Sequence, residues 1–131
     1  MTSRRAGSTP YRSTKLVGAH FGGIRQPMAV SWPNTIKADS TPRPQFHHVI
    51  DIVPTIYEAT KIKSPQVVNG FPQDSIDGIS LAYTFVDAKA TGQRKTQFFD
   101  IMASRGIYHD GWFASAFGPR EPWVGGIPKG A

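Results

Sequence analysis

Short apolar runs separated by small or polar residues are clearest in the last third of the chain, where they predict an antiparallel sheet. Residues 97–102, 105–109 and 112–117 are rich in aromatic and β-branched side chains, and each run is bounded by small or polar residues. Asp110 and Gly111 separate the second run from the third, and a two-residue hairpin turn of type I′ needs positive φ at both of these positions. We therefore expect three strands, with a tight hairpin between the last two.

A second pattern, with a period of three to four residues, lies between Phe46 and Thr60. The apolar positions that share this period are Phe46, Val49, Ile50, Val53, Ile56 and Tyr57. Such spacing places them on one face of a helix. Pro54 lies inside the pattern, lacks an N–H and disfavours helical geometry at the preceding residue. We expect a first turn over 47–51 and a main helix that begins near Pro54.

The rest of the chain is interrupted by glycine and proline. We interpret Gly22-Gly23 as part of a turn over 22–27, followed by a short buried strand over 28–32 that Pro33 ends. A weaker strand is predicted over 79–85. The segments expected to be loops are 34–45, 61–80 and the polar stretch 87–94.

Composition limits the class of protein. The chain has 131 residues, of which 39% are hydrophobic and 18% charged, with 13 glycines and 11 prolines. These values fit one loop-rich domain and exclude a coiled coil or a collagen-like repeat. No apolar run approaches the roughly 20 residues that span a bilayer, so we expect no membrane partner. The absence of cysteine excludes disulfides, cysteine zinc sites and a thiol nucleophile.

The formal net charge is +6, which raises the question of nucleic-acid binding. The basic residues are spread along the chain, and the only adjacent pairs are Arg4-Arg5 and Arg94-Lys95. No recognition helix with several arginines on one face is evident. Nucleic acid is therefore not the favoured partner, whereas an anionic small molecule remains compatible with the charge.

The histidines show no metal-binding spacing, although composition alone leaves a Ser-His-Asp triad open. Those available are His20, His47, His48 and His109. His47 and His48 are adjacent and would point about 100° apart on a helix, so they cannot readily bind one metal ion. No Gly-x-Ser-x-Gly elbow or phosphate-binding loop is present. The residues by themselves indicate a basic α/β piece with no assigned chemistry.

Short blocks of sequence indicate which protein family this chain resembles. Gly22-Gly23-x-Arg25-x-Pro27 and Asp51-x-x-Pro54-Thr55 stand in this order. They are accompanied by blocks at 10–15, 30–33, 46–50, 68–70, 83–85, 95–99 and 106–112. Together the blocks resemble the second half of an arylsulfatase, a sulfatase of the alkaline-phosphatase-like superfamily, and the resemblance extends over about residues 7–123.

The resemblance implies an α/β fold of the alkaline-phosphatase type that is only partly present in this chain. Residues 1–14 would be an extended lead-in, and 15–93 the downstream part of the sulfatase α/β domain. Residues 94–118 would form its small C-terminal antiparallel sheet, and 119–131 a tail. Because a partial domain lacks the sheet that its apolar segments should cover, we expect exposed apolar surface and marginal stability.

The function implied by the resemblance is hydrolysis of a small-molecule sulfate ester. In sulfatases a formylglycine, made from Cys or Ser in a Cys/Ser-x-Pro-x-Arg motif, attacks sulfur, and a calcium ion polarises the sulfate oxygens. Both would be supplied by a missing upstream half, so that calcium ligands are not expected in this chain and the chain alone would be inactive. The alternative is a non-catalytic remnant, or a basic fragment that binds anions without turnover.

Two side chains are candidates for the substrate site, Lys15 and His20, and a third, Arg25, is expected to play a structural part. Lys15 matches the family's downstream lysine, which contacts sulfate; a solvated surface lysine is the alternative, and in this chain we expect Lys15 to be exposed. His20 could line the pocket or simply pack. We expect Arg25 to tie the Gly-Gly turn to a carboxylate or carbonyl.

Ser8 is a weaker candidate for the nucleophile. Ser8-Thr9-Pro10-Tyr11-Arg12 matches Ser-x-Pro-x-Arg, yet it leads directly into the downstream Gly-Gly block. Three common residue types at fixed spacing also recur by chance. The sequence therefore favours a nucleophile upstream of this chain.

Overall fold

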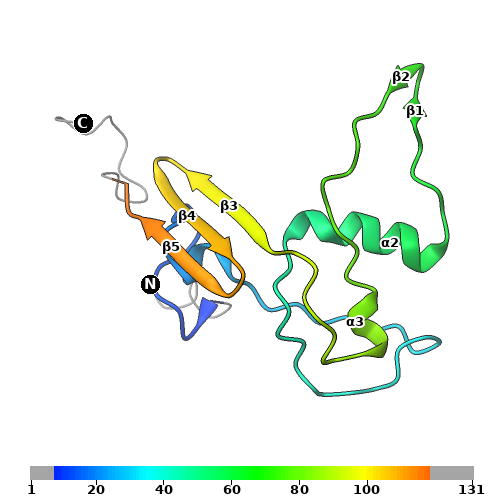
Figure 1. The fold of residues 1–131 in the computed structure, drawn as a ribbon, viewed down its shortest axis with the longest axis horizontal. Helices are drawn as coiled ribbons and strands as arrows, with labels where there is room; N and C mark the ends of the chain where they lie inside the picture. Colours follow the sequence, from blue (N-terminus) through cyan, green and yellow to red (C-terminus); the bar gives the residue numbers. More distant parts are fainter. Residues whose placement is uncertain (1–7, 119–131) are drawn as a thin grey trace. The chain divides into compact units, whose positions relative to one another are not determined.

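The computed structural model describes residues 8–118, and the chain divides into two units. One unit comprises residues up to Val30 and from Lys95 onward, and the other comprises Ser31–Arg94. The described residues combine short helices with two small antiparallel sheets, so the protein is of mixed α and β structure, as expected (Figure 1).

The first unit is built on a three-stranded sheet. Its strands are β3 (Thr96–Ile101), β4 (Ser104–His109) and β5 (Trp112–Ala116), antiparallel in the order β3-β4-β5. Asp110 and Gly111 have φ angles of 43° and 93°, as a tight hairpin turn requires. The sheet and its second hairpin, predicted from the three apolar runs and from Asp-Gly, are confirmed.

The turn between β3 and β4 differs from the prediction. Ile101 pairs with Ser104, so Met102 and Ala103 form the whole connection, with φ angles of 49° and 65°. Neither residue favours this left-handed region, because a Cβ crowds the following carbonyl oxygen there. The first predicted strand therefore ends one residue earlier, and the second begins one residue earlier.

This strained turn supports a prediction about stability. Ala103→Gly should raise the free energy of unfolding by about 0.5–1 kcal/mol, since relief of left-handed strain exceeds the entropic cost of glycine. The matched control is Ala114→Gly inside β5, which should lower it by a similar amount. Thermal denaturation of the two variants would test this, and a loss of stability in Ala103→Gly would contradict it.

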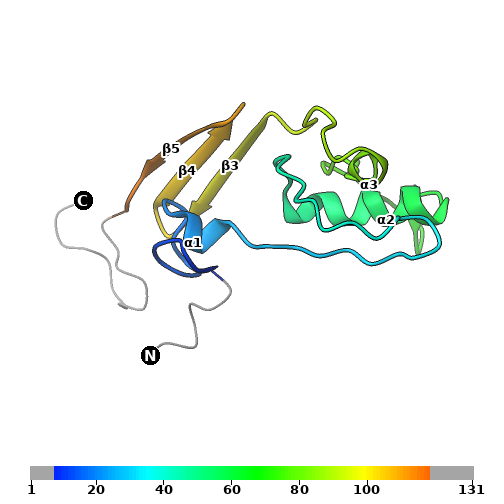
Figure 2. The same ribbon diagram turned by 90° about the horizontal axis from the view of Figure 1, so that it is seen from below.

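One face of the sheet is covered by α1 (Phe21–Ile24) (Figure 2). Phe21 and Phe113 have ring centroids 4.9 Å apart, and Phe99 lies 6.4 Å from Phe113. Gly22 and Gly23, expected in a turn, lie instead within this single helical turn. They pack directly on backbone oxygens of Arg12 and Val17, where a Cβ would not fit.

The strand predicted over 28–32 is wrong. These residues have no strand assignment, and Met28 and Val30 are about half exposed (54% and 48%). A strand needs a neighbour for its backbone groups, and no strand in the described part of the chain pairs with this segment. Prolines at 27 and 33 also remove backbone donors at both of its ends.

The second unit contains the predicted helix. A 3-10 turn, η2 (Val49–Asp51), leads directly into α2 (Ile52–Thr60), and Pro54 lies in the first turn of α2. The helix ends where Lys61 adopts a left-handed conformation, with φ 58°. Its predicted end at Thr60 and its start near Pro54 are confirmed, whereas the turn before it covers 49–51 and not 47–51. Within residues 8–118, no helix is long and apolar enough to cross a membrane.

The segment after α2 contains more structure than predicted. Within the expected loop 61–80, β1 (Val67–Val68) and β2 (Phe71–Pro72) form a small hairpin around Asn69-Gly70. The strand predicted over 79–85 is wrong, because α3 (Tyr83–Val86) occupies its second half.

No strand forms over 79–82 because the backbone N–H groups before α3 have side-chain acceptors. Those of Ile79 and Leu81 donate to side chains of residues 51 and 55, and not to a neighbouring strand.

Few apolar side chains are buried. Among the described residues, the buried hydrophobic ones are Val17, Ala19 and Leu81. The apolar stripe of the helix region is largely exposed, as Val49 (69%) and Ile56 (53%) illustrate. The expected exposed apolar surface is confirmed, and marginal stability stays a prediction.

Candidate functional site

Lys15 lies in a loop that packs against α1 and is exposed, as expected for this chain. The N–H of Gly22 donates to the carbonyl of Arg12 at 3.0 Å, and Gly23 lies against the carbonyls of Thr14 and Val17. The Gly-Gly block therefore holds the backbone on both sides of Lys15. The structure brings together the predicted lysine and the glycines that the resemblance places beside it.

Ser8 is buried, with 7% of its surface exposed, and its hydroxyl oxygen accepts a hydrogen bond from Gln26 Nε2 at 3.2 Å. The structure therefore shows a buried Ser8 whose hydroxyl is engaged by Gln26.

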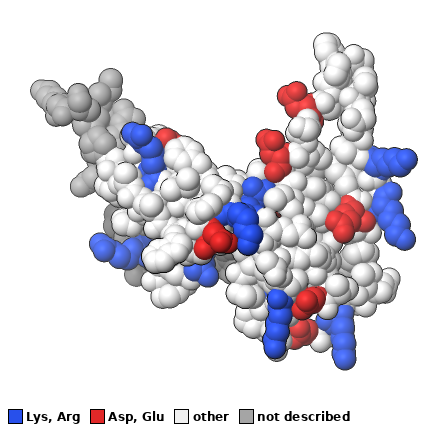
Figure 3. Space-filling view, viewed as in Figure 1, with Lys and Arg blue, Asp and Glu red and all other residues white. Residues whose placement is uncertain are grey.

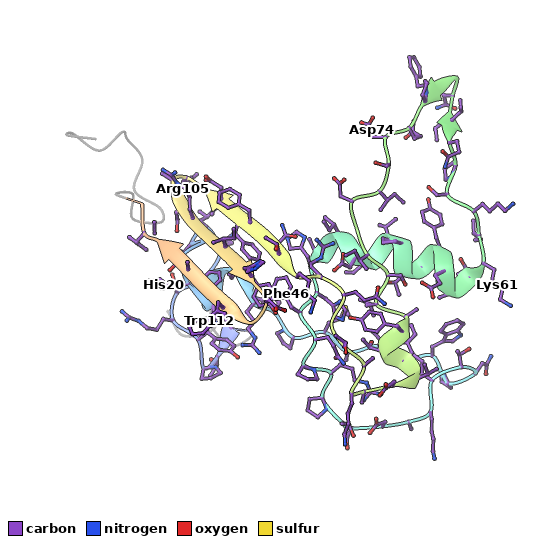
Figure 4. The ribbon with its side chains drawn as sticks, viewed as in Figure 1. His20, Phe46, Lys61, Asp74, Arg105 and Trp112 are labelled. Carbon is purple, nitrogen blue, oxygen red and sulfur yellow. The ribbon has the colours of Figure 1, made fainter. Side chains whose placement is uncertain are left out.

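His20 directly precedes α1, and its ring lies 5.6 Å from that of Phe117 (Figure 4). Arg25 makes no bond to a carboxylate or carbonyl of residues 8–118, contrary to the expectation. Its guanidinium instead lies over the rings of Tyr11, at 5.0 Å, and Phe21, at 5.7 Å. An arginine stacked on two aromatic rings stiffens the end of the Gly-Gly block through cation–π attraction.

A second cluster, in the unit of residues 31–94, centres on Asp51, which is fully buried. Arg94, 8% exposed, donates from Nε to Asp51 Oδ2 at 2.9 Å and from a terminal nitrogen to Oδ1. The N–H groups of His48 and Ile79 donate to the same carboxylate, each at 2.8 Å. Thr55, one turn along α2, accepts the N–H of Leu81 at 2.9 Å.

These hydrogen bonds determine the charge of Asp51 and whether its oxygens are available to other groups. Burial raises the pKa of its carboxyl, but hydrogen bonds from Arg94, His48 and Ile79 outweigh burial and hold the pKa below its usual 3.8. Four donors occupy the two oxygens, so this carboxylate is neither a proton acceptor nor a calcium ligand. The Asp51–Arg94 pair is a structural connection between the start of α2 and the segments around residues 79 and 94.

His47 lies beside this pair. Its Nδ1 is 3.9 Å from Asp51 Oδ2, its ring centroid is 5.9 Å from that of Tyr83, and its buried Nε2 has no hydrogen-bond partner among the described residues. Burial lowers the pKa of His47, and Arg94 adds to this, whereas Asp51 opposes it. Burial lowers the pKa of His48 as well. Both rings thus favour the neutral form.

A pH dependence of stability follows from these shifts. Below the ordinary histidine pKa of 6.5, His47 and His48 bind protons more readily in the unfolded chain than in the folded chain, where their pKa values are lower. The free energy of unfolding should therefore fall as pH drops from 7 toward 5. A further fall is expected below pH 3.8, where Asp51 becomes protonated in the unfolded chain.

Urea denaturation at a series of pH values would measure this slope. His47→Gln combined with His48→Gln should flatten the slope between pH 7 and 5 and leave the acid limb near pH 3. An unchanged slope in the double variant would contradict the assignment.

Sequence reasoning missed Arg94. The signal for a partner was present, because Asp51 stands between isoleucines in an apolar pattern and a buried carboxylate needs a counter-charge. The sequence could not identify which of the 15 basic residues pairs with Asp51, since Asp51 and Arg94 are 43 residues apart.

Lysines and arginines are scattered over the visible face, with acidic residues between them (Figure 3). Across residues 8–118 no group of three or more histidine, aspartate or glutamate side chains could hold a metal ion. Comparison with family models, curated proteins and solved structures finds no match to this chain.

Proposed function

We propose that this chain is the C-terminal portion of an arylsulfatase with an alkaline-phosphatase-like fold, an enzyme that hydrolyses aryl sulfate esters. The observation that carries the proposal is the ordered pair of signature blocks, Gly22-Gly23-x-Arg25-x-Pro27 and Asp51-x-x-Pro54-Thr55. Each is a short pattern, and their order along one chain is more specific than either alone.

The local roles of the signature residues support the proposal. Gly22 and Gly23 lie where a side chain would collide with backbone oxygens, and Arg25 stacks on two rings. Asp51 and Thr55 accept the N–H groups of Ile79 and Leu81. These patterned residues therefore hold neighbouring segments in place, which is a physical reason for such a pattern to exist.

The exposed apolar surface supports the idea that the chain is a portion of a larger domain. A stripe along η2 and α2, represented by Val49, Val53 and Ile56, is half to two-thirds exposed. Burying a side chain of this size contributes about 1.5–3 kcal/mol. A partner segment that covered the stripe would therefore contribute several kcal/mol to folding.

In the proposed enzyme, Lys15 contributes positive charge to the sulfate site. Its ammonium is a compact charge on a flexible stem, carried by a loop whose backbone the Gly-Gly block fixes. When complete, the enzyme has a formylglycine nucleophile and a calcium ion to activate the ester, both from upstream. The present chain contributes the lysine, on a loop anchored by the Gly-Gly block.

Co-expression with the segment encoded upstream tests the proposal. That segment should contain Cys/Ser-x-Pro-x-Arg and bind this chain in a one-to-one complex, and the amides of α2 should become more protected from hydrogen exchange in the complex. The free chain should show a weak thermal transition.

Two results would overturn the proposal. One is an upstream segment without the motif. The other is a free chain that unfolds cooperatively with a large calorimetric enthalpy and ignores the upstream segment, and such a chain would fit the non-catalytic, anion-binding alternative.

A further inference from the structure

We propose that Asn69-Gly70 is a site of spontaneous covalent modification, at which the asparagine side chain deamidates through attack by its own backbone. The dipeptide forms the tip of the β1–β2 hairpin, and both residues are exposed with φ angles of 51° and 84°. Beyond Asn69, Gly70 and Phe71, no atom lies within 4 Å of the position that a Gly70 Cβ would take, so a five-membered ring has room to form.

The reactive groups are not held elsewhere. Among the described residues no hydrogen bond engages the side-chain amide of Asn69 or the N–H of Gly70. The hairpin consists of two residue pairs, Val67 with Pro72 and Val68 with Phe71. A hairpin this short is marginal, so it opens easily and lets the chain reach the reactive geometry. Asp74, on its returning limb, is also exposed (Figure 4).

The reaction needs only water. The Gly70 nitrogen bonds to Asn69 Cγ, the Cγ–Nδ2 bond breaks, and Nδ2 leaves as ammonia with the proton that the Gly70 nitrogen loses. The product is a succinimide. Water then opens one of its two carbonyl–nitrogen bonds and gives aspartate or, with the backbone passing through the side chain, isoaspartate. Glycine favours the first step because it presents no Cβ to the attacking nitrogen.

The chain contains its own controls. Asn34, its other asparagine, precedes the β-branched Thr35, whose N–H donates to the carbonyl of Trp32 at 3.0 Å. The nitrogen that would attack is therefore hindered and engaged. Asp110-Gly111 occupies a comparable hairpin tip, but Asp110 Oδ1 pairs with Lys95 Nζ at 3.1 Å as a carboxylate, which is a poor electrophile.

Modification would change the character of the hairpin. It adds a negative charge to the turn between Val68 and Phe71, and the side chain of Phe71 is 72% exposed. The formal net charge of +6 falls by one. Isoaspartate also lengthens the backbone of a two-residue turn whose register depends on its length. The modified hairpin should therefore pack less well into any apolar surface.

Peptide mapping by mass spectrometry of the purified full chain, aged at neutral pH, tests the proposal. The peptide that contains Asn69 should convert to aspartate and isoaspartate at least about tenfold faster than the peptide that contains Asn34, equivalent to a barrier difference of about 1.4 kcal/mol. Hydroxylamine, which cleaves the succinimide, should cut between residues 69 and 70. Asn69→Gln should remove both signals, because its ring would need six members.

A parallel incubation in urea separates chemistry from structure. Similar Asn69 rates in the folded and denatured chain are expected if the hairpin gives no protection. Rapid conversion in urea together with a folded-state rate no faster than that of Asn34 would show that the hairpin protects the site, and would overturn the proposal.

Discussion

Asp51→Asn is expected to unfold the unit of residues 31–94. The change removes the negative charge that a nearly buried guanidinium faces, and breaking a buried pair in this way costs about 3–5 kcal/mol. It also weakens the acceptor for the N–H groups of His48 and Ile79. Domains of this size are stable by only about 5–15 kcal/mol, so a marginal one would not survive the loss.

Hydrogen exchange at the amides of α2 is the measurement, because it reports this unit even if the sheet of the other unit persists. Arg94→Lys should cause an intermediate loss, since lysine keeps the charge but not the two-pronged geometry. The control is Asp100→Asn, whose exposed pairing with Arg105 at 3.9 Å should contribute less than about 1 kcal/mol. Equal protection in Asp51→Asn and Asp100→Asn would contradict the structural role of Asp51.

Lys15→Ala is expected to impair turnover by the complete enzyme, in which this chain is joined to its upstream half. Two unit charges about 4 Å apart gain only about 1 kcal/mol in water, and several times more in a closed, partly dry pocket. Loss of one preorganised stabilising group costs about 2–4 kcal/mol of barrier, which corresponds to about 30- to 900-fold in kcat.

Two variants complete this test. Lys37→Ala removes another exposed lysine and should leave kcat unchanged. Ser8→Ala removes a hydroxyl that accepts a bond from Gln26, and should be nearly silent if the nucleophile lies upstream. An inactive Ser8→Ala enzyme together with an active Lys15→Ala enzyme would show that the chain had been assigned to the wrong end of the sulfatase.

Local signals were enough to predict the three-stranded sheet and the helix. Asp110-Gly111 specifies a turn by its own backbone preferences, and Pro54 fixes where a helix can begin. Both depend on residues close in sequence.

Features that depend on distant partners could not be predicted. The 28–32 segment has the composition of a strand but no strand beside it. Met102 and Ala103 form a turn because β3 and β4 pair on either side of them, although neither residue favours the positive φ that the turn requires. For the candidate site, Lys15 was chosen because of its place in the sequence just before the Gly-Gly block, whereas the Asp51–Arg94 pair depends on tertiary structure alone.

The central claim, that this chain supplies the downstream part of a sulfatase, is tested most directly by turnover of a chromogenic aryl sulfate in the presence of calcium. The purified 131-residue chain should be inactive, and activity should appear when the upstream segment with its Cys/Ser-x-Pro-x-Arg motif is added. Turnover by the chain alone, or none by the assembled pair with its motif converted to formylglycine, would contradict the account.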